Sequence, residues 1–406
     1  MDALTTPSNW QRVRLGDIAE IKRGASPRPI ENPKWFCTNS NVGWVRISDI
    51  SKNSRFLYKT AQKLSKKGIE KSRLVKQNSL IMSMCATIGK PIITKIDTCI
   101  HDGFVVFENP KIDLNYLYYF LCYIEKEWLE SGQQGSQVNL NVDLIKNKEV
   151  FYPKDLNEQI AIANILSDVD HYLYSLDALI LKKESVKKAL RIKMLNQILA
   201  SNGVEFRELG DIILSLKTGL NPRSFFKLNT PNANNYYVTI RELEDYTIKF
   251  THQTDRIDDN ALSLCLKRSN LEKDDILFSG TGTIGKVSII EKNPNNWAIK
   301  EGIYSIKPNK KIVFPRFLMF CLESSNIQND IKNKSFGGIV KSIPMNDLQQ
   351  IQIPLPPLNE QIAIANILSA LDHEIISLKN KKRQFENIKK ALNHDLMSAK
   401  IRVLNK

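Results

Sequence analysis

Apolar residues recur at alternating spacings of three and four in two long stretches of the chain. The first set is Leu166, Val169, Leu173, Leu176 and Ile180. The second set is Leu368, Leu371, Ile375, Leu378 and Phe385, with a polar gap at Lys382. This spacing predicts an apolar seam along one face of a long helix in each stretch. We expect each helix to run about 40 residues, which is roughly 60 Å at the rise of an α-helix.

Prolines precede both predicted helices, at Pro153 and within residues 354–357. Proline is tolerated at a helix entry, where it restricts the incoming chain. An asparagine then follows as the expected N-cap, and a glutamate follows as the acidic neighbour that suits the positive end of the helix dipole. In the two stretches these residues are Asn157 with Glu158 and Asn359 with Glu360.

Twelve identical residues, LNEQIAIANILS, stand at 156–167 and again at 358–369. Fainter matches join 15–18 to 209–212 and 87–90 to 283–286. A repeat with a period near 200 residues is too long for a solenoid and indicates a duplicated domain-plus-helix unit. The sequence therefore predicts four segments: a first divergent domain at 1–155, a repeated helical region at 156–200, a second divergent domain at 201–357 and a second helical region at 358–406.

Two matching seams in one chain are expected to pair with each other. Because the second domain connects the two helices, an antiparallel pair would place the two domains at opposite ends. The alternative is that each helix packs only on its own domain. The duplicated segment also repeats polar residues that pairing alone does not require, which suggests two copies of one partner site. A recent duplication that has not yet drifted is the other reading of this identity.

The chain is basic, with 58 Lys and Arg against 43 Asp and Glu, a net charge of +15 and a pI near 9.3. Such an excess favours a polyanionic partner, since each neutralised phosphate releases counterions. Residues 52–76 carry nine basic residues against Glu70 alone, whereas the corresponding part of the second domain is mixed in charge. Two related domains with different surface charge suggest two related sites with different targets. A solvated helix face is the simpler reading of the basic run.

Several classes of function are disfavoured by what the sequence lacks. No apolar run approaches eighteen residues, and the first ten residues show no signal region, so we expect a cytoplasmic protein without membrane contact. The six cysteines and five histidines do not group at zinc-binding spacings, which predicts reduced thiols and no metal site.

One apparent catalytic motif does not survive comparison of the two halves. Residues 280–286 read GTGTIGK, but Val287 stands where a phosphate-binding loop needs Ser or Thr, and residues 84–90 in the first half read MCATIGK. The shared element is only the turn Thr-Ile-Gly-Lys.

Two other catalytic motifs are also not supported. Glu20 lies in a fragment that resembles a nuclease motif, but Ser215 replaces it in the second half. The Asn/Asp-Pro-Pro-aromatic signature of amino-methyltransferases is also absent, because Leu358 follows Pro356 and Pro357.

With these features in place, the chain resembles the specificity (S) subunit of type I restriction-modification systems over essentially its whole length. The most specific element is the proline-containing lead-in to LNEQ-x-x-I, at 152–160 and 353–362. The Leu-Gly-Asp-Ile opening at 15–18, the stretch Val-Arg-Ile-Ser-Asp-Ile at 45–50 and the Thr-Ile-Gly-Lys turn also look like that family's recognition domains.

The resemblance implies α/β (α+β) recognition domains in two copies in a pseudo-two-fold arrangement, separated by an antiparallel pair of long helices. Strand-like runs at 79–83, 104–107 and 286–290 suit such domains. It further implies a non-catalytic subunit that binds double-stranded DNA, each domain reading one half of a bipartite site while the helices set the spacer. The implied partners are two methyltransferase subunits, which methylate adenine with S-adenosylmethionine, and restriction subunits that use ATP and Mg²⁺. This chain itself would hold no cofactor.

Candidate contact residues follow from their chemistry, because Arg and Lys suit guanine or phosphate and Asn or Gln suit adenine. In the first domain the DNA-binding candidates are Lys22, Arg23, Arg28, Arg46, Lys90, Gln133, Gln134, Ser136, Gln137 and Asn139. In the second domain they are Lys217, Arg223, Arg241, Lys286 and Lys341. The partner-binding candidates are Glu158, Gln159, Asn164, Glu360, Gln361 and Asn366.

Each candidate is also compatible with an ordinary solvent-facing role. The competing classes are a coiled-coil scaffold for partners other than nucleic acid and a fused enzyme. Salt-dependent DNA binding separates the first from a DNA reader, and absence of methyl transfer and ATP turnover by the chain alone excludes the second.

Overall fold

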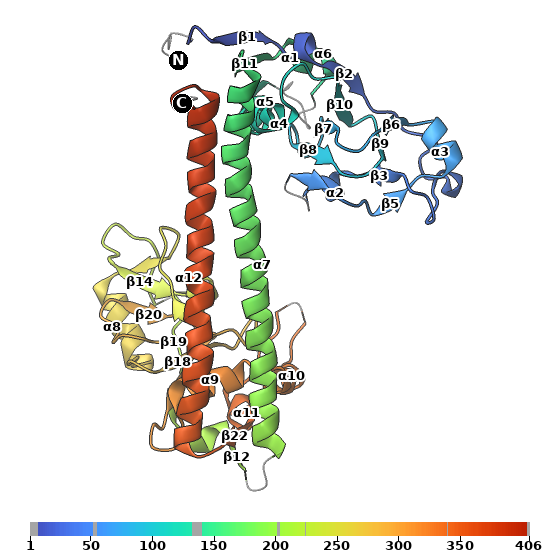
Figure 1. The fold of residues 1–406 in the computed structure, drawn as a ribbon. Coiled ribbons are helices and arrows are strands. Elements are labelled where there is room, and N and C mark those ends of the chain that lie inside the picture. The colour runs from blue at the N-terminus through green and yellow to red at the C-terminus, as the bar shows by residue number, and fades with distance from the viewer. Residues whose placement is uncertain are drawn as a thin grey trace. The chain divides into compact units, whose positions relative to one another are not determined.

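The computed structural model describes residues 7–51, 55–131, 140–200, 204–223, 225–338 and 340–403. Two long helices stand out, α7 (Leu156–Ala200) and α12 (Leu358–Met397), drawn in green and red in Figure 1. The chain divides into two compact units, Met1–Leu176 with Lys382–Lys406 and Asp177–Lys381. Each unit thus combines one globular domain with a stretch of both helices. The two long helices expected from the heptad spacing are confirmed.

The first domain contains a five-stranded sheet in the order β2-β10-β7-β8-β4 and a four-stranded sheet in the order β5-β3-β9-β6. Their strands are β2 (Glu20–Arg23), β3 (Gly43–Val45), β4 (Phe56–Leu57), β5 (Gln62–Lys63), β6 (Arg73–Val75), β7 (Leu80–Ser83), β8 (Pro91–Thr94), β9 (Thr98–Ile100) and β10 (Phe104–Glu108). A separate antiparallel pair joins β1 (Trp10–Arg14) to β11 (Glu149–Pro153) at the exit from the domain. The helices are α1 (Leu15–Ile18), α2 (Ile47–Ser51), α3 (Lys66–Glu70), α4 (Leu114–Tyr123), α5 (Glu125–Ser131) and α6 (Val142–Asn147), with the 3-10 turn η1 (Pro33–Trp35).

The second domain repeats this plan with one strand fewer in each of its two larger sheets. Its sheets have the orders β13-β21-β18-β19 and β17-β14-β20, with the small pairs β15-β16 and β12-β22. The strands are β12 (Glu205–Glu208), β13 (Ile213–Thr218), β14 (Asn235–Val238), β15 (Leu243–Glu244), β16 (Thr247–Ile248), β17 (Arg256–Ile257), β18 (Ile276–Ser279), β19 (Val287–Ile289), β20 (Trp297–Ile299), β21 (Ile303–Pro308) and β22 (Gln352–Leu355). The helical pieces are η2 (Leu209–Ile212), η3 (Ile240–Glu242), α8 (Asp259–Arg268), α9 (Pro315–Leu322), α10 (Ser325–Asn333) and α11 (Met345–Gln349).

The central strands are buried on both faces. All four residues of β7 and of β18 are buried, which explains why they appear in the sequence as continuous apolar runs without a polar alternation. The strand-like runs expected at 79–83, 104–107 and 286–290 correspond to β7, β10 and β19. Each domain is therefore a mixed helix and sheet fold, as the resemblance implied.

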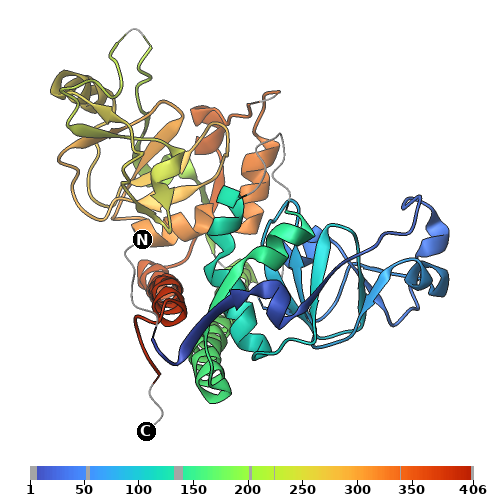
Figure 2. The same cartoon turned by 90° about the horizontal axis from the view of Figure 1, so that it is seen from above.

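The two helices pair antiparallel within each unit. In the first unit the rings of Tyr172 and Phe385 lie 4.5 Å apart, centroid to centroid. In the second unit Lys183 bonds to Glu374 at 2.8 Å, and Lys379 pairs with Glu184 at 2.7 Å. In the first unit Asp170 pairs with Lys389 and Tyr172 contacts Phe385, and in the second Glu184 pairs with Lys379 and Lys187 with Asp372. The partner number on α12 falls along these contacts in each unit as the number on α7 rises, which defines the antiparallel sense. Figure 2 shows the helices nearly end on, with strands of the first domain beside the start of α7.

The helices also pack on the domain of their unit, but the alternative in which each helix packs only on its own domain is wrong, because α7 and α12 contact each other in both units. The core of the first domain includes Ile162 and Leu166 from the start of α7 and Leu396 from the end of α12. In the second unit Ile364 and Leu368 from the start of α12 enter the equivalent core. Each domain therefore contacts both helices, and the helix seam continues into the domain core.

The predicted N-caps are wrong by two residues. Helix α7 begins at Leu156, and the Asp155 carboxylate accepts a hydrogen bond from the backbone N–H of Asn157 at 2.9 Å. Asn157 and Asn359 both lie inside the first turn. Before α12, the Pro357 carbonyl accepts from the N–H of Glu360. The residue just before the repeat differs between the two copies, Asp155 in the first and Pro357 in the second, so the repeat itself does not contain the cap.

Asp275 is an acidic residue whose side chain is buried in the second domain. It is 2% exposed, and one carboxylate oxygen accepts from the N–H of Glu272 at 2.9 Å. Burial raises the pKa of Asp275 to about 6, because loss of water disfavours the charged form more than its hydrogen bonds favour it.

This raised pKa gives a pH dependence of stability. The folded state binds the Asp275 proton more tightly than the unfolded state does, so the stability associated with it is complete below about pH 4 and lost as the pH rises through about 6. We expect Asp275→Asn, which carries no charge, to remove this loss. Denaturant unfolding from pH 4 to pH 7 should show the wild type losing about 2–3 kcal/mol relative to the variant. Parallel pH curves for the two proteins would contradict the assignment.

Candidate nucleic-acid interface

A recess of about 520 Å³ in the first domain brings together residues that lie far apart in the sequence. Its lining includes Arg28, Arg46, His101 and Asp102. Arg28 follows β2, Arg46 follows β3, and His101 and Asp102 form the turn between β9 and β10. Strand ends thus supply the polar groups, as is usual for binding residues carried on connections between rigid strands.

Neighbouring side chains orient both arginines of this recess. Arg28 lies 3.5 Å from a carboxylate oxygen of Asp102, and Arg46 donates from Nε to the Gln62 side chain at 2.9 Å. Arg23, another predicted contact, donates to the backbone carbonyl of Asp102 at 2.7 Å. These bonds leave further N–H groups of each guanidinium for a ligand, which is how an arginine fork is held toward a phosphate or a guanine edge.

His101 contributes a neutral donor at the same place. The N–H of Gly103 donates to its Nδ1 at 2.9 Å, so the ring proton of the neutral form is on Nε2. Burial lowers the pKa of His101, which favours that neutral form. His101 was not among the sequence candidates, because only the folded turn brings it beside Arg46.

The remaining first-domain candidates have different surroundings. Lys22 pairs with Glu108 at 2.6 Å and with Glu20 at 2.8 Å, and the bond to Glu108 raises its pKa. Lys90 is half-buried in the turn between β7 and β8. Gln133, Gln134, Ser136, Gln137 and Asn139 lie outside the described residues.

The basic run at 52–76 is only in part a charged surface. Lys63, Lys66, Lys67 and Lys71 are exposed around β5 and α3. Arg55 is instead 4% exposed and bonded inside the unit, so charge in the sequence alone overstates the cationic face.

In the second domain the five predicted residues are exposed, namely Lys217, Arg223, Arg241, Lys286 and Lys341. Arg241 is held by Asp255 at 2.7 Å, and Lys286 donates to the carbonyl of Ile240 at 3.1 Å. Arg241 and Lys286 are therefore positioned on the same part of the domain, around η3.

An aromatic cluster beside this region was missed by the sequence reasoning. The rings of Tyr236 and Phe250 stack at 4.4 Å, and the Arg256 guanidinium lies 4.6 Å from the Tyr236 ring. Aromatic faces and arginine planes are suited to stacking on bases or sugars. No motif in the sequence indicated this cluster, because its three residues come from β14, β17 and the segment between β16 and β17.

The Thr-Ile-Gly-Lys turns are structural in both domains. Each joins two antiparallel strands, β7 to β8 and β18 to β19, and no helix follows as a phosphate-binding loop requires. Gly89 and Gly285 have φ of 74° and 90°. A Cβ at Gly89 would lie 2.2 Å from the Trp128 ring. The glycine is therefore needed for the turn rather than for a nucleotide.

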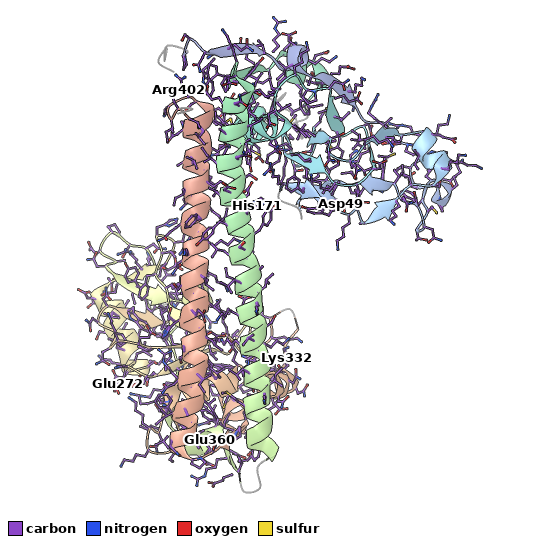
Figure 3. All side chains as sticks on the ribbon, in the orientation of Figure 1. Asp49, His171, Glu272, Lys332, Glu360 and Arg402 are labelled. Carbon is purple, nitrogen blue, oxygen red and sulfur yellow. The ribbon has the colours of Figure 1, made fainter. Side chains whose placement is uncertain are left out.

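Part of the duplicated polar sequence is used inside the chain. Glu158 is 5% exposed and accepts from Asn9 at 2.8 Å and from the Trp10 ring N–H at 3.2 Å. Arg402, labelled in Figure 3, approaches Glu158 to 3.7 Å. Glu360, also labelled in Figure 3, is the corresponding residue of the second copy and is exposed. The same residue therefore has different surroundings in the two copies.

The two glutamines have the same function in both copies. Gln159 accepts from the N–H of Asp113, and Gln361 accepts from the N–H of Phe314, both at 2.8 Å. Their amide groups donate to the carbonyls of Pro153 and Pro356, both at 2.9 Å. Each glutamine thus ties the start of a long helix to the start of α4 or α9 and to the incoming strand. Their burial places Glu158, Gln159 and Gln361 away from a free docking surface.

An exposed face of the repeat remains identical in the two copies. In the first copy Leu156 is 53%, Ile160 38% and Ile165 36% exposed. The second copy leaves Leu358, Ile362 and Ile367 exposed in the same way. Asn164 and Asn366, both predicted partner residues, are exposed on the same helices. Repeated exposed apolar residues are the kind of surface that interfaces bury.

No helix in the described ranges combines the length and apolar character that a membrane span needs. In the same ranges, no three His, Cys, Asp or Glu side chains come together in a way that could hold a metal ion.

Comparison with known proteins identifies the class. Residues 7–183 and 201–387 each match the family described as type I restriction modification DNA specificity domain. The chain belongs to this family, with two copies of its domain. This membership confirms the resemblance seen in the sequence and the prediction of a specificity subunit rather than an enzyme.

Particular relatives match over nearly the full length. The putative type I restriction enzyme MjaX specificity subunit of Methanocaldococcus jannaschii is 28% identical over 98% of this chain and 95% of that protein. The MjaVIII specificity subunit of the same organism is 24% identical over 100% of this chain and 96% of its own length. The crystal structure of the type I S subunit from M. genitalium covers 98% of this chain and 97% of its own, at 16% identity and a TM-score of 0.61, which shows a common fold.

The hydrogen bonds of the buried glutamines predict that substitutions at two adjacent residues differ in their effect on stability. Gln361→Ala removes three hydrogen bonds at a buried site and leaves the N–H of Phe314 without its acceptor, so we expect a loss of about 1–3 kcal/mol of unfolding free energy. Glu360→Ala, at the exposed neighbour, serves as the control and should change stability by less than about 0.5 kcal/mol. Denaturant unfolding measures both. Equal losses in the two variants would show that the tie contributes nothing specific.

Proposed function

We propose that this chain is the DNA reader of a type I restriction-modification complex and that each of its two domains reads one half of a bipartite site. The observation that carries the proposal is the repetition of one fold with different exposed chemistry. The first domain presents the recess of Arg28, Arg46 and His101, whereas the second presents Arg241, Lys286 and an aromatic cluster. Two domains that share one fold but expose different contact residues suit two different half-sites.

The long helices are proposed to set the spacer between the half-sites. Their lengths of 45 and 40 residues correspond to roughly 60–70 Å of rigid helix at the usual rise per residue. Antiparallel pairing within each unit supports a rod rather than two independent linkers. A rod of constant length would hold the gap between half-sites constant.

The exposed face of the repeat is proposed to dock two methyltransferase subunits. Leu156, Ile160, Asn164 and Ile165 of the first copy recur as Leu358, Ile362, Asn366 and Ile367, so two identical partners would meet two identical surfaces. This revises the partner set expected from sequence by replacing the buried Glu158, Gln159 and Gln361 with exposed apolar neighbours. A solved structure that resembles this chain with a TM-score of 0.56 and 15% identity is described as concerning complex assembly of the type I system.

The chemistry is proposed to take place on the partners. Methyltransferase subunits would use S-adenosylmethionine to methylate adenine, and restriction subunits would use ATP and Mg²⁺, all in the cytoplasm. The chain described here supplies target choice and spacing.

Exchange of one domain tests the bipartite reading. We expect that replacing residues 1–155 by those of a relative changes one half of the methylated motif and leaves the other half and the gap unchanged. Methylation mapping of a genome that expresses the chimera with its methyltransferase subunit gives the motif directly. The matched control replaces residues 204–355 and should change the other half. A chimera that alters both halves, or neither, would contradict the division of labour.

Acidic substitutions test the docking face. We expect Ile160→Asp to remove one methyltransferase subunit and Ile160→Asp with Ile362→Asp to remove both, because a carboxylate would be buried in each interface. Each affinity should fall by at least about tenfold, or about 1.4 kcal/mol. Leu181→Asp, at a 64% exposed position of α7 without an apolar counterpart in the second copy, is the control. Native mass spectrometry counts the subunits, and full assembly of the double variant at low concentration would rule this face out.

A further inference from the structure

Two ion pairs with buried aspartates join α7 to α12, one in each unit; the Lys389 side chain of the first pair is 28% exposed. In the first unit Lys389 lies 2.5 Å from Asp170, and in the second Lys187 lies 2.5 Å from Asp372. Asp170, Asp372 and Lys187 are 7%, 9% and 8% exposed. The aspartate and lysine stand at the same spacing in both helices, so the two pairs are the same contact repeated with the helices exchanged.

A tyrosine of the adjoining recognition domain completes each ion pair. In the first unit the Tyr119 hydroxyl donates to Asp170 at 2.6 Å and accepts from Arg55 at 2.9 Å. In the second unit the Tyr246 hydroxyl accepts from Lys187 at 2.7 Å and donates to Glu323 at 2.6 Å. Burial raises the pKa of both tyrosines, so they remain protonated donors.

The two domains thus use opposite members of the ion pair. A carboxylate only accepts hydrogen bonds and an ammonium only donates them, whereas a tyrosine hydroxyl does both. The first domain bonds to the aspartate, and the second bonds to the lysine. An Asp-Lys pair therefore offers both polarities at one place on the helices.

The contacting residues occupy equivalent positions with their chemistry exchanged. Arg55 and Tyr246 correspond, because their carbonyls accept from Ile93 and Ile289 in the matching strands. Tyr119 corresponds to Phe320, since each lies six residues after the N–H held by the duplicated glutamine. The hydroxyl thus comes from one position in the first domain and from the other position in the second.

We propose that each Asp-Lys pair is a socket of dual polarity, meaning a docking point that offers both a hydrogen-bond acceptor and a donor, and that it fixes the orientation of a recognition domain on the helices. One constant pair of helices can then accept domains with different contact residues. The proposal rests on the proposed function, because orientation matters for reading only if both domains engage one DNA. Tyr119 and Tyr246 are positioning residues in this scheme and touch no base. A domain released from its socket would still read its half-site but would no longer hold it at one distance from the other.

The test removes one hydroxyl at a time from the chain assembled with its methyltransferase subunits. The wild-type motif and gap are first determined by methylation mapping. Binding is then measured on duplexes that carry both half-sites with the native gap or with a gap one base pair shorter or longer. We expect Tyr119→Phe and Tyr246→Phe each to reduce the preference for the native gap by about tenfold or more, with the base preferences of both half-sites unchanged.

Tyr116→Phe is the matched control. Tyr116 is also fully buried on α4, but its hydroxyl donates to the carbonyl of Phe151 and does not reach the ion pair. It should lower thermal stability as Tyr119→Phe does and leave the gap preference as in the wild type. Equal gap preferences in the wild type and both socket variants would overturn the proposal.

If the single variants unfold, the proposal can still be tested by copying the residues around the second ion pair into the first unit. Arg55→Tyr, Tyr119→Phe, Cys122→Glu and Asn393→Arg together copy the second socket into the first unit, with its tyrosine, phenylalanine, glutamate and arginine. This quadruple variant should recover the native gap preference, whereas the triple variant that keeps Arg55 has no tyrosine hydroxyl at the ion pair and should not. Failure of the folded quadruple variant to recover it would contradict dual polarity. Wild-type protein that binds neither half-site would instead contradict the proposed function.

Discussion

The buried contact between α7 and α12 is the constraint on which each unit depends. Charges removed from water are tolerated only with a partner and further hydrogen bonds, so an Asp-Lys pair inside a helix interface admits few alternative registers. Asp170 with Lys389 and Asp372 with Lys187 satisfy this condition. The apolar seam alone would tolerate sliding by one heptad, since its residues are similar along the helix. The ion pairs remove that freedom, and the recognition domains then attach at the same places.

The duplicated segment combines two uses that a sequence does not separate. Gln159 and Gln361 face inward and hold the backbone N–H of the residue just before α4 or α9, while Ile160 and Ile362 face outward one residue later. Adjacent residues on a helix point about 100° apart, so one short segment can serve the core and the surface together. This explains why the identity covers polar and apolar positions alike, and it moves the proposed docking face from the buried glutamines to the exposed isoleucines.

The structure places two of the DNA-contact candidates together where chemistry and exposure coincide, and their contact with DNA stays a prediction. Arg28 and Arg46 were expected from residue type and indeed line one recess. Arg55 had the same residue type within a basic run but is buried against Tyr119, because a guanidinium with three hydrogen-bond partners can replace its water. His101 and the stack of Tyr236 on Phe250 were missed, since only the turns between strands bring these residues together.

Short motifs in the sequence carried the resemblance to the family, while period and repetition predicted the two long helices and led to the expectation that they pair. All of these signals are properties of neighbouring residues. Tertiary structure alone decided the true cap at Asp155, the inward direction of Glu158 and Gln361, and the different bonding of Tyr119 and Tyr246. Each of these depends on a partner far away in the chain, and identical residues acquire different contacts when the domain beside them differs. The physical reason is that a hydrogen bond is decided by which group comes within about 3 Å, and only the folded chain sets that distance.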